Sequence, residues 1–164
     1  MNPIKKIAWK LIKIWIRNRF PTVKHISTAA LAKRMAQADN LILIDARKLA
    51  EYTTSHLPSA LQANSVEAVE QIVSSPKTAV VVYCSIGYRS ARLAQQLTTA
   101  GYTAVNLEGS LFQWANEDRP LICEDRDTRR VHPFNAQWGW LLDDDKVWKT
   151  MPEKEPVGKI AKKI

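Results

Sequence analysis

A cysteine, a glycine and an arginine stand close together in the middle of the chain, at Cys84, Gly87 and Arg89. They follow an apolar run, 79–83, and precede a segment with helical spacing that begins at about Ser90. The amides of a tight loop and of a helix start can converge on an anion, and glycine allows the backbone angles that such a loop needs. We predict that these amides and Arg89 stabilise a Cys84 thiolate, the nucleophilic form of cysteine. The predicted anion-binding loop comprises Ser85, Ile86, Gly87, Tyr88 and Arg89.

Other residues that could do chemistry carry weaker signals. Cys123 lies past the last predicted strand, without a loop of this kind, so we expect it to be inert. Two cysteines are too few for a disulfide framework, and a reduced, cytoplasmic protein is expected. His56 is expected to be a structural hydrogen-bonding residue and not a general base. The adjacent aspartates 143–145 cannot converge on one ion without other ligands, so neither a metal site nor a cofactor is predicted.

Strand-like and helix-like segments alternate along the part of the chain that contains Cys84. Four apolar or β-branched runs predict strands: 25–27, 41–44, 79–83 and 103–107. Four segments with helical spacing predict helices: 28–38, 66–74, 90–100 and 111–115. This alternation indicates an α/β domain with a mostly parallel central sheet flanked by helices. Ligands bind beyond the carboxyl ends of such strands, so Asp45, Arg47, the Cys84 loop and residues 108–110 should share one edge.

Residues 4–17 have cations on one side and apolar side chains on the other when placed at helical spacing. The predicted amphipathic helix ends before Pro21. Lys10 and Lys13 interrupt the apolar stretch, which excludes a cleaved signal peptide and a membrane-spanning helix. Two interpretations remain. The helix lies in the surface of an anionic bilayer, at the inner face of a membrane, or its apolar stripe docks on the domain or on a second copy of the chain.

The basic residues concentrate at the two ends of the chain. Residues 1–24 carry a net charge of +7 and residues 146–164 of +4, whereas residues 25–145 carry −3. A nucleic-acid-binding protein would have its basic stripe on the folded domain, so we expect no nucleic-acid partner. We predict four parts: an amphipathic helix at 1–20, a domain at 21–117, a C-terminal extension at 118–150 packed on the domain, and a mobile basic tail at 151–164.

Four motifs, in order along the chain, resemble those of the single-domain rhodaneses. The string from Cys84 to Arg89 matches their C-x-x-G-x-R active-site loop, and Asp45–Ala46–Arg47 is similar to their Asp-x-Arg. The other two matches are Glu51–Tyr52 with His56–Leu57–Pro58–Ser59–Ala60, and Leu107–Glu108–Gly109 with Trp114. Residues 25–117 carry this resemblance. Serine replaces the usual glycine at three positions, where the local turns need not be the same: Ser55, Ser59 and Ser110.

The resemblance implies a rhodanese-like fold and persulfide chemistry at Cys84. The Cys84 thiolate would take the outer sulfur of a small anionic donor such as thiosulfate, or of a persulfide, and pass it to a thiol or to cyanide. The loop amides would hold the persulfide, and Arg89 would help to recruit the donor. Asp45, Arg47 and Glu51 would orient the loops, with an ion pair between Arg47 and Glu51.

Two other functions remain open. Cysteine-dependent phosphatases and arsenate reductases also place a thiolate in a loop closed by arginine, but phosphatase loops have five residues between the two, and here there are four. A catalytically silent interaction module needs none of Cys84, Gly87 and Arg89, so their presence argues against it. Sulfur transfer itself requires that Cys84 can be reached from solvent and that the loop amides point at its sulfur.

Overall fold

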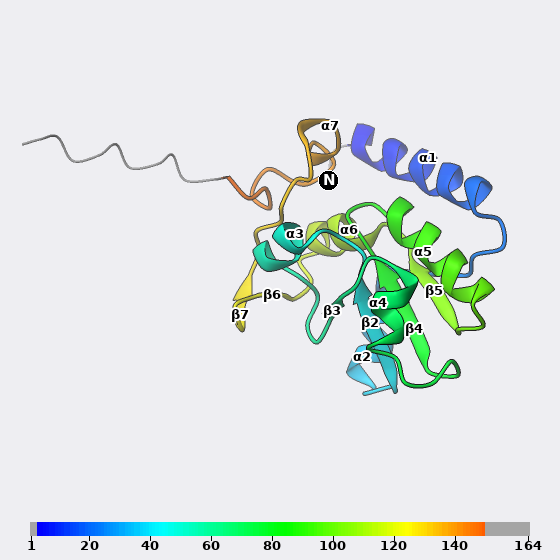
Figure 1. Ribbon diagram of the computed structural model, residues 1–164. Helices are drawn as coiled ribbons and strands as arrows, with labels where there is room; N and C mark the ends of the chain where they lie inside the picture. The colour runs from blue at the N-terminus through cyan, green and yellow to red at the C-terminus, as the bar shows by residue number, and fades with distance from the viewer. Residues whose placement is uncertain (1–2, 150–164) are drawn as a thin grey trace, which may run out of the picture.

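Five parallel strands form the central sheet, in the order β1-β5-β4-β2-β3 (Figure 1). The computed structural model describes residues 3–149, so the predicted basic tail at 151–164 lies outside the described residues. The mostly parallel sheet is confirmed, with β3 as a strand that the sequence pattern did not indicate. The strands are β1 (His25–Ile26), β2 (Leu41–Asp45), β3 (Leu61–Gln62), β4 (Ala79–Tyr83) and β5 (Ala104–Leu107).

Helices cover both faces of this sheet, as predicted, because the side chains of its central strands point alternately to opposite sides. In β4, Val80 and Val82 pack in the same apolar cluster as Leu97, whereas Val81 and Tyr83 belong to the cluster on the other face. The helices around the sheet are α2 (Thr28–Ala36), α3 (Leu49–Thr54), α4 (Val66–Glu70), α5 (Tyr88–Thr99) and α6 (Ser110–Asn116).

The element boundaries differ from the predicted ones in two places that matter for the site. Helix α5 begins at Tyr88, two residues earlier than expected, with Gly87 as its N-cap. Helix α3 was not predicted and begins at Leu49, so Arg47 lies before the helix and Glu51 inside its first turn. Helix α4 is shorter than the predicted 66–74 because it ends at Glu70.

The predicted amphipathic helix at the N-terminal end is present as α1 (Pro3–Arg19). It packs against both core clusters, since Trp9 lies in one of them and Ile16 in the other. Ion pairs add to this packing: Arg17 Nε lies 2.7 Å from a carboxylate oxygen of Glu108. The helix therefore docks on the domain, whereas much of its predicted apolar stripe stays exposed. Within residues 3–149, no helix is long and apolar enough to cross a membrane.

Residues 118–149 also pack on the domain. Two short antiparallel strands, β6 (Leu121–Cys123) and β7 (Arg126–Thr128), precede the short helix α7 (Ala136–Gly139). Val131, Leu141 and Leu142 are buried in the same cluster as Trp9, so this extension touches the core that α1 also covers. Asp143 and Asp145 pair with lysines, and residues 3–149 contain no group of acidic, histidine or cysteine side chains that could hold a metal ion.

Candidate active site

Loops from three strands meet at the carboxyl edge of the sheet, as the alternation of strands and helices predicted. Strand β4 ends at Tyr83 and delivers Cys84 to this edge. The loop after β5 holds the Cys84 loop in place, because the Leu111 amide donates to the Cys84 carbonyl at 3.1 Å and the Phe112 amide donates to the Ser85 carbonyl at 3.0 Å. Helix α6 thus fixes the backbone on either side of the sulfur.

The sulfur of Cys84 accepts hydrogen bonds from the start of α5. The Gly87 amide donates to Sγ at 3.2 Å, and the Ser90 hydroxyl lies 3.4 Å from the same atom. Gly87 has a φ of 110°, a backbone conformation that side-chain-bearing residues rarely adopt. Five loop amides were predicted to surround Sγ. Among the residues that the structure describes, one amide and one hydroxyl donate to it, so the cradle is smaller than expected.

Ser110 connects the Cys84 loop to the end of β5. Its hydroxyl accepts a hydrogen bond from the Cys84 amide at 3.1 Å and donates to the Leu107 carbonyl at 3.0 Å. Ser110 holds a φ of 50°, and Ser59 holds a φ of 60°, so both serines adopt the left-handed region that favours glycine. Ser55, the third such serine, is extended. The Ser110 hydroxyl makes contacts that a glycine could not.

Glu51 and Arg89 form a paired network beside the sulfur. The two guanidinium nitrogens of Arg89 each lie 2.8 Å from a different carboxylate oxygen of Glu51, and the Ser85 hydroxyl contacts both residues. Burial acts to raise the pKa of Glu51, but the hydrogen bonds and charge of Arg89, with the Lys48 amide, hold it below its ordinary value. Arg89 therefore stands near Cys84 with part of its charge already balanced.

Arg47 pairs with Asp45 and not, as predicted, with Glu51. Nε and one terminal nitrogen of Arg47 contact the carboxylate of Asp45 at 2.9 and 2.7 Å, and both side chains are fully buried. The same terminal nitrogen donates to the Ser55 carbonyl at 2.5 Å. Arg47 comes before α3 and points inward, so it cannot meet Glu51 across one helical turn. The pair anchors the segment that carries α3.

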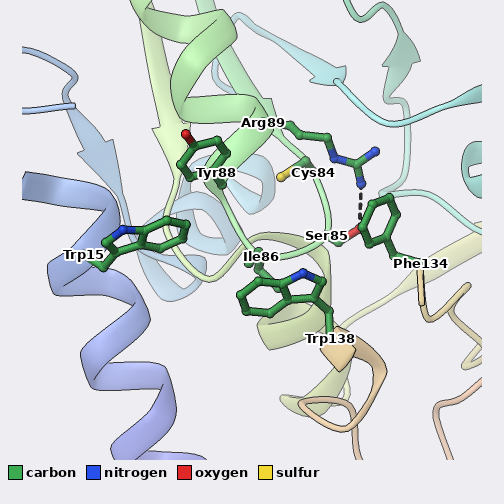
Figure 2. Close-up of a pocket in the computed structure, with 8 residues that line it drawn as sticks. All are labelled: Trp15, Cys84, Ser85, Ile86, Tyr88, Arg89, Phe134 and Trp138. Carbon is green, nitrogen blue, oxygen red and sulfur yellow. Dashed lines mark hydrogen bonds between the residues drawn. The ribbon is translucent and has the colours of Figure 1, made fainter. Parts of the chain in front are cut away.

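The sulfur lies at the bottom of a pocket of about 210 Å³ and not in an open loop. Cys84 is 1% exposed, which corrects the expectation of a thiol open to solvent. The Cys84 loop forms one side of the pocket, and three aromatic side chains from distant segments form the other: Trp15 of α1, and Phe134 and Trp138 of the extension (Figure 2). The sequence pattern around Cys84 gives no sign of these walls.

This fold and this loop agree with a known family. The family model for the rhodanese-like domain matches residues 27–117, more than half of the chain. The chain belongs to this family. It is 32% identical over 102 residues to a protein of Allochromatium vinosum named Sulfurtransferase, an alignment that covers 61% of this chain and 95% of the relative. It is 31% identical over 99 residues to YtwF of Bacillus subtilis, whose name also contains the word sulfurtransferase, with 60% and 96% covered.

Solved structures show the same rhodanese-like fold. A thiosulfate sulfurtransferase from Pseudomonas aeruginosa superposes with a TM-score of 0.60 at 18% identity, over 70% of this chain and 22% of that one. A rhodanese-related protein from Thermoplasma volcanium gives 0.54 at 23% identity, over 62% and 99%. The family domain at 27–117 contains Cys84, Glu51 and Arg89, whereas Trp15, Phe134 and Trp138 lie outside it. The rhodanese-like core thus supplies the sulfur site, and this chain's extensions supply the pocket walls.

The structure places the remaining candidate residues away from the pocket walls. The ring of His56 stacks on Tyr52 with centroids 4.1 Å apart, and its Nδ1 lies 3.2 Å from the Tyr52 carbonyl. The Cys123 thiol donates to the Thr53 carbonyl at 3.5 Å. Neither side chain lines the pocket over Cys84. The hydrogen bonds of Ser90 to Sγ and of Ser110 to the Cys84 amide were not predicted from the sequence.

The Glu51 network predicts that the rhodanese-like domain loses stability in acid. Because the pKa of Glu51 is lower in the folded chain than in the unfolded one, the network contributes fully above the unfolded value, near 4.5, and its contribution is lost as the pH falls through the folded value. Urea unfolding at pH 7 and at about pH 3.5 should show a smaller drop in unfolding free energy for Glu51→Gln than for the wild type. An equal drop in both proteins would contradict this role of Glu51.

Proposed function

We propose that this rhodanese-like protein is a sulfurtransferase that carries sulfur as a persulfide on Cys84. The observation that supports this most directly is the position of Sγ. It lies at the end of β4, accepts hydrogen bonds from the Gly87 amide and the Ser90 hydroxyl, and faces a pocket. Family membership and relatives named as sulfurtransferases support the same function. Thiosulfate, or a persulfide, is the proposed donor, and a thiol or cyanide is the proposed acceptor.

The first half of the cycle loads one sulfur atom onto Cys84. The thiol gives its proton to water, and the thiolate attacks the outer sulfur of thiosulfate. A bond forms between Sγ and that sulfur while the S–S bond of thiosulfate breaks, and its electron pair leaves with sulfite. The Gly87 amide and the Ser90 hydroxyl, which already donate to Sγ, would stabilise negative charge at this end of the persulfide.

The second half of the cycle returns the thiolate. An acceptor such as cyanide attacks the terminal sulfur of the persulfide, the Sγ–S bond breaks, and thiocyanate leaves. Burial acts to lower the pKa of Arg89, but the Glu51 hydrogen bonds and the negative charge of Cys84 outweigh it and raise the pKa above its ordinary value. The guanidinium therefore stays charged throughout. Because Glu51 holds this guanidinium on both nitrogens, we assign Arg89 mainly to holding the loop, with a lesser part in recruiting the donor.

The experiment that tests this proposal follows the sulfur itself. Incubation of the full chain with thiosulfate should add the mass of one sulfur atom to the intact protein, and cyanide should then remove it and release thiocyanate. An arsenate reductase or phosphatase would instead turn over arsenate or p-nitrophenyl phosphate without gaining sulfur. A silent interaction module would gain no mass and turn over none of these compounds. Either result would refute the proposal.

Gly87→Ala should impair transfer more than its loss of stability explains. A Cβ at Gly87 would stay 3.5 Å or more from its neighbours, so the cost comes from the φ of 110°. That strain should lower the unfolding free energy by about 1–3 kcal/mol or shift the loop. A shifted loop withdraws the Gly87 amide from Sγ, and we expect thiocyanate formation to fall by at least about tenfold.

Gly101→Ala is the matched control for this variant. Gly101 has a φ of 91° with no atom within 4 Å of an added Cβ, so it should lose a similar amount of stability. It lies beyond the C-terminal end of α5, whereas Gly87 caps the start of that helix, and its rate of transfer should stay at the wild-type value. Equal rates for the two variants at equal stability would mean that the Gly87 amide has no part in transfer.

A further inference from the structure

The pocket over Cys84 has aromatic walls that the family domain does not supply. Trp15 comes from α1, and Phe134 and Trp138 come from the extension, so all three lie outside residues 27–117 (Figure 2). Ile86 and Tyr88 of the Cys84 loop add apolar surface on the opposite side. A small anion such as thiosulfate has no apolar part that could use these walls. The pocket therefore has apolar surface for a group that thiosulfate does not carry.

Ring contacts, a cation–π contact and a helix cap hold these walls in place. The ring of Trp15 stacks on Tyr88 with centroids 4.9 Å apart, and Phe20 packs edge-on against the other side of Tyr88 at 5.2 Å. The Phe134 ring lies under the Arg89 guanidinium, 4.6 Å from its carbon. Asn135 caps the short helix that carries Trp138, accepting from its amide at 2.9 Å. A preformed aromatic pocket favours a rigid apolar group that fits it without reordering the walls.

The positive charge at the pocket is also limited. Arg89 is the charged residue among those that line it, and both of its terminal nitrogens already bind Glu51. One partly neutralised cation suits a donor with a single negative charge next to the sulfur. The pocket volume of about 210 Å³ exceeds the roughly 150 Å³ of a cavity that accepts benzene. An aryl or similar apolar group attached to a singly charged sulfur end matches both features.

We propose that this pocket binds the apolar group of an organic sulfur donor, of which an aryl thiosulfonate is the model compound. This inference rests on the proposed sulfur transfer at Cys84. The Cys84 thiolate attacks the terminal sulfur of R–SO₂–S⁻, a bond forms between Sγ and that sulfur, and the donor's S–S bond breaks. Its electron pair leaves with the sulfinate R–SO₂⁻, so charge and electrons balance without another reactant. Trp138, Trp15 and Phe134 hold R during this step.

The test compares an aryl donor with a methyl donor on the full chain. We expect kcat/KM for benzenethiosulfonate to exceed that for methanethiosulfonate by about tenfold or more in the wild type. Trp138→Ala should reduce this ratio to about threefold or less. The same folded protein molecules turn over both donors, so the ratio of the two kcat/KM values does not depend on how much of a variant is folded. Trp140 is a nearby tryptophan that does not line the pocket, and Trp140→Ala should keep the wild-type ratio.

A binding measurement separates this inference from the proposed function. Quenching of tryptophan fluorescence should show that benzenesulfinate, which has no sulfur to transfer, binds at least about tenfold more tightly than methanesulfinate. Trp138→Ala, but not Trp140→Ala, should remove that difference. Equal binding of the two sulfinates by the wild type would overturn the pocket proposal. Preferential aryl binding without transfer from any donor would support the pocket and refute sulfur transfer.

A second surface rests on a different observation, the outer face of α1. Three apolar side chains at helical spacing are strongly exposed there: Ile7 at 62%, Leu11 at 61% and Ile14 at 45%. Trp9 and Ile16, on the opposite side of the helix, are buried in the two core clusters. The helix is therefore apolar on two sides, and only one of them is used by the domain.

The charge of α1 indicates what covers this exposed stripe. The helix contains six lysines and arginines and no acidic residue. Arg17 and Lys13 pair with Glu108, whereas Lys6 and Lys10 have no acidic partner within residues 3–149. Packing the stripe against a second copy would bring two such cationic helices together, which costs free energy. We infer that the stripe of Ile7, Leu11 and Ile14 docks on an anionic lipid bilayer.

Vesicle sedimentation with the full chain tests this docking. We expect binding to vesicles that contain phosphatidylglycerol, little binding to pure phosphatidylcholine, and weakening by salt. Leu11→Glu should reduce the bound fraction by about tenfold. Leu49 on α3 is also exposed, at 62%, and Leu49→Glu should leave the bound fraction unchanged. Absence of wild-type binding to the anionic vesicles would overturn the inference. So would a dimer in solution that Leu11→Glu dissociates while vesicle binding is unchanged.

Discussion

Cys84→Ser is expected to lower kcat/KM for sulfur transfer from thiosulfate to cyanide by at least about 1,000-fold. A serine at this position is close in size and can still accept the hydrogen bonds of the Gly87 amide and the Ser90 hydroxyl, so the loop should keep its shape. Its hydroxyl does not ionise at neutral pH and cannot hold a second sulfur as a persulfide. Thiocyanate formation measures the loss, and a circular dichroism spectrum identical to that of the wild type shows that the fold is intact.

Cys123→Ser is the matched control, because it removes the second thiol of the chain. That thiol, at the end of β6, contacts the Thr53 carbonyl of α3 and does not line the pocket over Cys84. We expect its kcat/KM to stay within about twofold of the wild type. A large loss in Cys123→Ser would show that the two thiols act together, for example by passing sulfur between them. Retention of most of the activity in Cys84→Ser would remove the proposed nucleophile altogether.

The part of the site that could be predicted is the part encoded in short stretches of sequence. An apolar run delivers Cys84 to the sheet edge, and Gly87 and Arg89 follow within six residues, so local spacing alone indicates an anion-binding loop. The parallel sheet follows from the alternation of apolar runs and amphipathic segments, and α2 begins directly after Ser27, whose hydroxyl caps it by accepting from the Ala30 amide. These features depend on neighbours in the chain, which a sequence displays directly.

The rest of the site depends on contacts between distant residues. Glu51 meets Arg89, which is 38 positions away. Arg47, the partner predicted for Glu51, instead pairs with Asp45, because α3 begins only at Leu49. The pocket walls come from farther still, in segments on either side of the family domain. Their apolar residues predicted packing, and α1 does pack, but no pattern within these segments indicates that Trp15 and Trp138 would enclose Cys84.

The buried Asp45–Arg47 pair should produce the largest loss of stability. Both side chains are 0% exposed, and Arg47 donates to the carboxylate from Nε, from a terminal nitrogen and from its own amide. Asp45→Asn leaves a guanidinium in the core without a counter-charge, and we expect the unfolding free energy to fall by about 3–5 kcal/mol. Arg47→Met should cost less, because a buried aspartate left alone can take up a proton, whereas a guanidinium cannot lose one.

A double variant makes this prediction independent of how severely either single change damages the fold. Asp45→Leu with Arg47→Met removes both charges and fills the site with apolar atoms, so it should be more stable than Asp45→Asn alone. Urea unfolding of three proteins at pH 7 should rank their unfolding free energies: the wild type highest, then the double variant, then Asp45→Asn. If Asp45→Asn instead loses less than about 1 kcal/mol, water must reach Arg47 readily, and this pair could not be what anchors α3 and Glu51 beside the sulfur.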